Sequence, residues 1–154
     1  MRIIQAQELK QKFTVAIVIS RFNEEITQGL YEGAVARLKE LGFSEGQITC
    51  VWVPGAVEIP IVANRLAQTA AYEAIICLGA VIQGETKHFD YVCEHVNNGC
   101  LRVALDNDIP VIFGVLTTDN EEQARERIGG KVGHKGKEAV DAAVEMVSVL
   151  RQIG

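Results

Sequence analysis

Four apolar runs recur along the chain, and none of them alternates cleanly between apolar and polar residues. The runs are Thr14–Ile19, Ile48–Val53, Ala74–Ile82 and Val111–Leu116. A strand with one face in water alternates, whereas a strand covered on both faces has a continuous apolar run. The four runs therefore predict a parallel sheet with helices on both faces.

Segments with helical periodicity separate these runs. Apolar residues recur every three or four positions over residues 26–41, 59–70 and 89–103, which predicts three amphipathic helices. Asn23 is the expected N-cap of the first helix, and Gly42 is its expected C′ residue. Pro60 fits the first turn of the second helix, where a missing N–H group has little effect.

The last third of the chain predicts two further helices. Thr118-Asp119-Asn120-Glu121 has the spacing of a capping box and opens a short helix that ends near Ile128. A glycine-rich turn follows at residues 129–136, and the last helix covers about residues 137–150. With right-handed crossovers, this order predicts a doubly wound α/β sheet within a single domain, residues 1–154.

Composition narrows the classes of function. The 154 residues carry a net charge of −5 without a Lys/Arg run, which argues against nucleic-acid binding. The longest apolar run has only nine residues and the first ten lack a signal-peptide core, so we expect a cytoplasmic protein without a membrane partner. The four cysteines have no metal-ligand spacing and are expected to be small buried hydrophobic residues; they are Cys50, Cys77, Cys93 and Cys100.

The strongest chemical signal lies where the third apolar run ends. Gln83-Gly84-Glu85-Thr86-Lys87-His88 follows Ile82 directly and leads into a helical pattern. A turn of this kind presents backbone N–H groups to an anion, and His88 can carry protons near neutral pH. His95 lies two turns further along and is expected to pack, whereas the glycine-rich setting of His134 leaves its role open.

Two other strand ends allow two interpretations each. Phe22 is either a hydrophobic staple or a stacking platform for a flat heterocycle. Glu58 is either a first-turn acid favoured by the helix dipole or an acceptor for ligand hydroxyl and N–H groups. No P-loop, dinucleotide fingerprint or nucleophile elbow is present, which leaves acid–base and positioning chemistry on an anionic substrate.

Taken together, these segments closely resemble the lumazine synthase family over essentially the whole chain. The matching blocks are Arg21-Phe22-Asn23, Val53–Pro60, Gly79–Phe89, Pro110–Thr117, Arg127 and Gly133-His134-Lys135-Gly136. The resemblance implies a flavodoxin-like three-layer sandwich with a four-stranded parallel sheet, and an enzyme without cofactor or metal. The implied reaction condenses 5-amino-6-(D-ribitylamino)uracil with 3,4-dihydroxy-2-butanone 4-phosphate to 6,7-dimethyl-8-ribityllumazine, releasing phosphate and water, as the penultimate step of riboflavin biosynthesis.

The resemblance also implies roles for individual residues. His88 is the implied catalytic proton carrier, and Phe22 is the implied stacking platform. The other implied substrate-binding residues are Ala56, Val57, Glu58, Ala80, Val81, Ile82, Glu85, Thr86, Phe113, Arg127 and Lys135. Members of the family form homopentamers with sites between neighbours, so that Phe113 and Arg127 come from the adjacent subunit. The short turn at residues 129–133 accompanies sixty-subunit icosahedral shells in the family, which can enclose riboflavin synthase.

Three other functions compete with this one. A non-catalytic flavin or lumazine binder would keep Phe22 but would not need both His88 and Arg127. A purely structural shell protein would not need polar groups gathered at strand ends. A riboflavin synthase of related fold has no phosphate substrate, which would leave Arg127 and Gly84-Glu85-Thr86 without a purpose.

Overall fold

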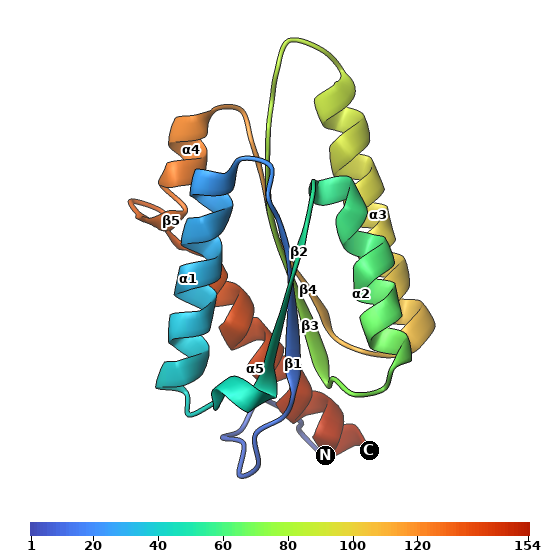
Figure 1. Ribbon diagram of the computed structural model, residues 1–154. Coiled ribbons are helices and arrows are strands. Elements are labelled where there is room, and N and C mark those ends of the chain that lie inside the picture. The colour runs from blue at the N-terminus through green and yellow to red at the C-terminus, as the bar shows by residue number, and fades with distance from the viewer.

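Four parallel strands form the centre of the protein, in the order β2–β1–β3–β4 (Figure 1). The computed structural model describes residues 1–154. The strands are β1 (Val15–Ser20), β2 (Ile48–Val53), β3 (Ala74–Ile82) and β4 (Val111–Thr118). Every predicted strand is present. The fourth is longer than expected because it pairs with β3 as far as Ile82 and Thr118.

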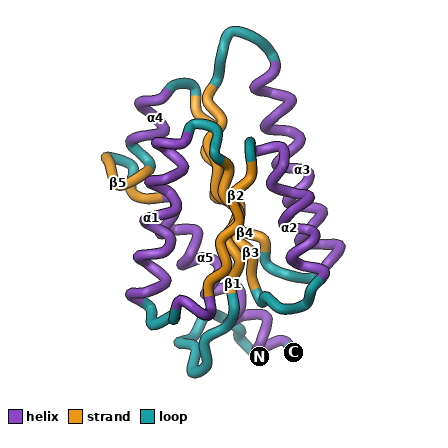
Figure 2. The backbone as a smooth tube through the Cα atoms, in the orientation of Figure 1, coloured by secondary structure: helices purple, strands orange, loops and turns teal.

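Helices cover both faces of the sheet and give three layers (Figures 1 and 2). The elements outside the central sheet are α1 (Glu24–Glu40), α2 (Ile59–Gln68), α3 (His88–Asn107), α4 (Glu121–Arg125), α5 (Lys135–Ile153), the 3₁₀ turns η1 (Glu45–Gln47) and η2 (Ala56–Glu58), and a hairpin of β5 (Ile128–Gly130) and β6 (Gly133–His134). In the figures α1 and α4 lie on one side of the sheet, with α2 and α3 on the other. The predicted α/β class with a four-stranded parallel sheet is confirmed. None of the helices combines the length and apolar character needed to cross a bilayer.

The sheet separates two hydrophobic clusters. Ile17, Ile76 and Leu78 pack with α1 and α5 on one face. Val18 and Ile75 pack with α2 and α3 on the other. All six residues of β1 are buried, because this strand has a neighbour on each edge and helices on each face. The continuous apolar runs of the sequence follow from this double coverage.

The start of α1 differs from its prediction. Asn23 occupies the N-cap position, but its side chain makes no capping hydrogen bond. Its backbone is left-handed, with φ of 62°, a conformation that asparagine tolerates better than most residues. Its Nδ2 group donates a 2.8 Å hydrogen bond to the carbonyl of Ala80, so Asn23 links the end of β1 to β3. Gly42 has the expected positive φ after α1, at 92°.

The predicted capping box after β4 lies two residues further along the chain. Asn120 is the N-cap of α4 and accepts a hydrogen bond from the backbone N–H of Gln123. The Gln123 side chain accepts in return from the N–H of Asp119. Thr118 belongs to β4, and its hydroxyl donates to the Asn120 carbonyl. The helix then ends at Arg125, three residues before the predicted end.

The glycine-rich segment forms a hairpin, which the sequence had predicted only as a turn. Gly129 and Gly133 have positive φ angles of 102° and 91°, which side-chain-bearing residues seldom adopt. The last helix starts at Lys135, two residues earlier than expected, because the His134 side chain caps it.

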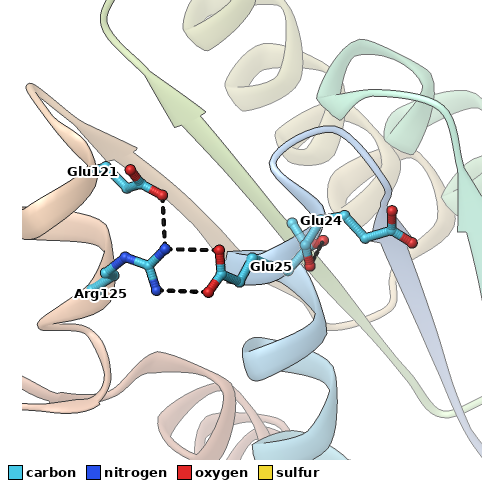
Figure 3. Close-up of polar contacts among 5 residues, drawn as sticks. Glu24, Glu25, Glu121 and Arg125 are labelled. Atoms are coloured by element: carbon cyan, nitrogen blue, oxygen red, sulfur yellow. Dashed lines mark hydrogen bonds and ion pairs between the residues drawn. The ribbon is translucent and has the colours of Figure 1, made fainter.

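An ion-pair cluster joins α4 to the first turn of α1 (Figure 3). The Arg125 guanidinium donates to both carboxylate oxygens of Glu25, at 3.1 and 2.8 Å, and to Glu121 at 2.9 Å. The hydrogen bonds from Arg125 lower the pKa of the Glu25 carboxyl. Exposed pairs contribute little stability, so the main effect of this cluster is to orient α4 and the segment that follows it.

The cysteines match the expectation only in part. Cys77 and Cys100 are buried, whereas Cys50 and Cys93 are half-buried, and all four are unpaired. Burial raises the pKa of the Cys50 and Cys93 thiols, which keeps them protonated.

The close packing around Gly114 of β4 allows the fold to be tested by substitution. A Cβ atom on Gly114 would lie 2.7 Å from Leu78 Cδ2 and 2.9 Å from the backbone oxygen of Cys77. We expect Gly114→Ala to lower the free energy of unfolding by about 1–3 kcal/mol, because the backbone oxygen cannot move aside. Urea denaturation measures this. Gly46→Ala is the matched control, since nothing lies within 4 Å of the added atom; equal losses in the two variants would contradict the packing argument.

Candidate functional site

A cavity of about 300 Å³ lies at the carboxyl ends of β1, β2 and β3. In a sheet of this order, β1 and β3 flank the point where the chain reverses its direction of progress, which is where such folds bind ligands. The lining residues come from three strand ends and the start of α3: Phe22, Asn23, Gly55, Ala56, Val57, Ala80, Val81, Ile82, Gly84, Thr86, His88, Phe89 and Val92.

The turn after β1 is held by hydrogen bonds to two neighbouring strand ends. The backbone N–H of Arg21 donates to the Val53 carbonyl at 2.8 Å, and that of Phe22 donates to the Pro54 carbonyl at 3.0 Å. Together with the side-chain bond of Asn23, these contacts fix the backbone of Phe22. The Phe22 side chain is 71% exposed at the cavity wall. Such exposure disfavours the hydrophobic staple and leaves the ring free to stack.

The 3₁₀ turn η2 brings Ala56 and Val57 to the cavity. Glu58 lies in the same turn but does not line the cavity: its Oε1 atom accepts a 2.9 Å hydrogen bond from the N–H of Gly55. His95 donates from Nε2 to the Val57 carbonyl at 3.1 Å. Sequence reasoning assigned His95 to packing and so missed this contact, which fixes the cavity wall from α3.

The loop from Gln83 to Lys87 supplies free hydrogen-bond donors. The Gln83 N–H donates to the Thr118 carbonyl, whereas the N–H groups of residues 84–87 donate to no group of the protein. Thr86 does not cap α3 as its N-cap residue, but its hydroxyl accepts from the N–H of His88 at 3.3 Å. Thr86 and His88 line the cavity, while the Glu85 side chain does not. Free N–H groups beside an imidazole suit an anionic group that exchanges protons.

Phe113, Arg127 and Lys135 lie elsewhere. They line a second cavity of about 330 Å³, together with residues of β4 and the side chains of Val132 and Glu138. The two cavities share no lining residue. Within one chain, therefore, the cavity-lining residues suggested by the sequence form two separate groups, one with His88 and one with Arg127, while Glu58 and Glu85 line neither cavity.

The second cavity carries two cationic side chains. Arg127 donates one hydrogen bond to the Gln123 carbonyl at 2.8 Å, and its nearest carboxylate, Glu126, is 3.9 Å away. Most of the guanidinium donors therefore remain available. The N–H of Lys135 donates to the Arg127 carbonyl at 2.8 Å, so the two residues are joined through the backbone. An arginine fork beside a lysine is suited to a phosphate or carboxylate group.

The structure also adds residues that sequence reasoning did not place in a site. Asn23 and Phe89 line the first cavity, and Thr117 and Glu138 line the second. Asn23 carried a signal, because an asparagine after a strand is suited to more than capping. The others follow from the paths of α3, β4 and α5 and have no sequence signal of their own.

Comparison with known proteins identifies the family of this chain. The family described as 6,7-dimethyl-8-ribityllumazine synthase matches residues 12–151. Proteins named 6,7-dimethyl-8-ribityllumazine synthase from two Coxiella burnetii strains, RSA 493 / Nine Mile phase I and Dugway 5J108-111, are each 52% identical over 144 residues, which cover 94% of this chain and 95% of each relative. The match thus covers nearly the whole length of both chains, and the family match spans the lining residues of both cavities. The chain belongs to the 6,7-dimethyl-8-ribityllumazine synthase family.

Proposed function

We propose that the protein condenses 5-amino-6-(D-ribitylamino)uracil with 3,4-dihydroxy-2-butanone 4-phosphate, forming 6,7-dimethyl-8-ribityllumazine with loss of phosphate and water. One observation carries the proposal: Phe22, His88, and Gly84 and Thr86 with their free N–H groups all line one cavity. They provide a surface for a flat ring, donors for an anion and a proton carrier.

The heterocycle occupies the part of the cavity formed by strand ends. The pyrimidine stacks on Phe22, and backbone groups of residues 56–57 and 80–82 hold its edge. Glu58 has one carboxylate oxygen committed to Gly55, while its Oε2 atom accepts no hydrogen bond within the chain. That oxygen is available for the ribityl hydroxyls, which combines both interpretations of Glu58 in one side chain.

His88 moves protons at the carbonyl and at the leaving group. The 5-amino nitrogen attacks the ketone carbon, and water leaves after the oxygen receives a proton. A proton is then removed beside the new C=N bond as the phosphate C–O bond breaks. The resulting enol becomes a ketone as a proton moves from its oxygen to the terminal carbon. The ribitylamino nitrogen then attacks this ketone carbon and closes the second ring with loss of a second water. The Glu85 and Thr86 N–H groups face the phosphate throughout, so that alignment of two substrates supplies most of the acceleration.

Arg127, Lys135 and Phe113 complete the site from a neighbouring copy. This accounts for two groups of site residues that line separate cavities within one chain. Apolar side chains are available for association, because Phe22 and the α3 residues Tyr91, Leu101 and Leu105 are 55–73% exposed. Large exposed apolar side chains on one protein commonly mark an interface. We propose a homopentamer whose copies each give one half of a site.

The same proposal includes an assembly larger than the pentamer and a location in the cytoplasm. The tight β5–β6 hairpin, in which Gly130 pairs with Gly133, is compatible with a sixty-subunit icosahedral shell able to enclose riboflavin synthase. Four unpaired cysteines fit the reducing cytoplasm.

The direct test mixes the purified protein with both substrates and follows lumazine absorbance and phosphate release together. We expect equal amounts of the two products. Phosphate release without lumazine, or no reaction from an assembled and folded protein, would contradict the proposed function.

Replacement of His88 tests the proton-transfer role. We expect His88→Ala to lower kcat by about 10²-fold, at the low end of what a positioned acid–base group contributes, because substrate alignment remains. Steady-state kinetics and sedimentation of the same sample measure rate and assembly. Complete loss of activity with intact assembly and substrate binding would show that His88 does more than carry protons.

Replacement of Arg127 tests the anion site. We expect Arg127→Ala to raise the KM for the phosphate substrate about tenfold or more, while the KM for the uracil substrate stays unchanged, since a charge-assisted fork is lost. Arg125→Ala is a matched control from the same segment, because Arg125 pairs with Glu25 and Glu121 instead of lining the second cavity. An unchanged KM in Arg127→Ala would refute the assigned role.

Coexpression of two defective chains tests whether sites are shared. In assemblies of His88→Ala and Arg127→Ala chains at equal amounts, about a quarter of the intersubunit sites would contain both intact residues, as expected for a head-to-tail ring. At a low concentration of the phosphate substrate, we expect mixed assemblies to exceed the average of the two pure variants. If each chain held a complete site, coexpression would give only that average.

A further inference from the structure

The imidazole of His134 serves as the N-cap of α5. Its Nδ1 atom accepts hydrogen bonds from the backbone N–H groups of Gly136, at 3.1 Å, and Lys137, at 3.3 Å. A ring nitrogen accepts only when it carries no proton, so His134 is neutral here and holds its proton on Nε2. The side chain thus caps the helix N-terminus, as serine, asparagine or aspartate commonly does.

Glycines make room for the ring between α1 and α5. A Cβ atom on Gly33 of α1 would overlap the imidazole, and one on Gly136 of α5 would lie 3.0 Å from its Cε1 atom. His134 therefore fills a gap between two helices and fixes the start of α5 against α1.

The two cationic residues of the second cavity, Arg127 and Lys135, are both joined to the segment that contains this cap. Lys135 follows His134 directly and is the first residue of α5. Arg127 is joined to the same segment, because the Lys135 N–H donates to the Arg127 carbonyl and Ile128 pairs with His134. Any displacement of the α5 start would move both cations together.

We propose that His134 is a positioning residue for the Arg127 and Lys135 side chains, and that its neutral ring holds them in place by capping α5 and packing against α1. The proposal rests on the proposed function only in naming a substrate phosphate as the anion. His134 itself does not touch that anion: it does not line the second cavity, whereas Arg127 and Lys135 do.

Protonation of His134 would release this cap. A proton on Nδ1 removes the acceptor for both N–H groups and puts a positive charge at a helix N-terminus, where cations are unfavourable. Burial and the charge of Lys137 lower the pKa of His134, against smaller opposite effects from the Gly29 carbonyl and the Glu138 carboxylate. The charged side chains that act on the ring, Lys137 and Glu138, both belong to α5, and α1 and β5 approach the ring at Gly33 and Gly129.

The direction of the pH effect follows from this lowered pKa. The unfolded chain binds a proton at the ordinary histidine value of 6.5, above the value in the folded protein. The stability from the neutral cap is therefore fully present above about pH 6.5 and is lost as the pH falls through the folded pKa. We expect the Arg127 and Lys135 side chains to be held less firmly in place over the same pH range.

Two substitutions at His134 distinguish the effect of the helix cap from the effect of protonation. His134→Asn keeps a capping side chain that does not titrate, and His134→Ala removes the cap. At about pH 7.5, a pH that leaves the wild-type ring neutral, we expect His134→Ala to raise the KM for the phosphate substrate roughly fivefold, as loss of a typical cap would, with little change in the KM for the uracil substrate. We expect His134→Asn to restore most of the wild-type value.

The dependence of the KM for the phosphate substrate on pH distinguishes this role from a merely structural one. The wild-type KM for the phosphate substrate should rise as the pH falls below 6.5 by more than that of His134→Asn. The Lys137→Gln substitution, which removes the charge that lowers the His134 pKa, should shift this rise to higher pH. Identical profiles for wild type and His134→Asn, or an unchanged KM in His134→Ala, would overturn the proposal.

Measurements without turnover keep this test separate from the proposed reaction. Inorganic phosphate is the probe, and isothermal titration calorimetry of the assembled protein gives its affinity. We expect weaker phosphate binding in His134→Ala than in wild type, and an unfolding midpoint that falls more steeply with acid in wild type than in His134→Asn. Absence of lumazine formation alongside these results would contradict the reaction only. Equal phosphate affinity and equal acid sensitivity in all three proteins would reject the role of His134.

Discussion

Double burial of the two inner strands is the constraint on which the rest of the structure depends. β1 and β3 each pair on both edges and are covered by helices on both faces, so nearly every side chain along them must be apolar. Polar chemistry is therefore excluded from the sheet and confined to the strand ends. Because all four strands run parallel, their carboxyl ends lie at one edge, and the first cavity forms there.

Short backbone contacts turn that edge into an ordered site. The turn after β1 is tied to β2 and β3, η2 is held by Glu58 and His95, and Gln83 is tied to β4. The N–H groups of the next four residues donate to no group of the protein. The site is suited to an anion because hydrogen bonds hold the surrounding strand ends in place while the N–H groups of residues 84–87 remain free to donate.

The sheet, the covering helices and a site at the strand ends could be predicted from the sequence, because each depends on local periodicity and on parallel strand ends. Its limits were contacts between segments far apart in the chain. Asn23 bonds to Ala80 and His134 lies against Gly33, and neither partner is visible from local spacing. The hairpin at β5–β6 was missed because its strands, of three and two residues, are too short to show a recognisable periodicity. The roles of Phe113, Arg127 and Lys135 remain predictions, because a single chain does not bring them to His88.

The space that Gly33 leaves for the His134 ring has an evolutionary consequence. Positions 33 and 134 cannot vary independently, since a side chain at 33 would overlap the imidazole at 134. Relatives with a larger residue at position 33 should therefore carry a smaller residue at 134. Positions a hundred residues apart in the chain would then be expected to change as a pair.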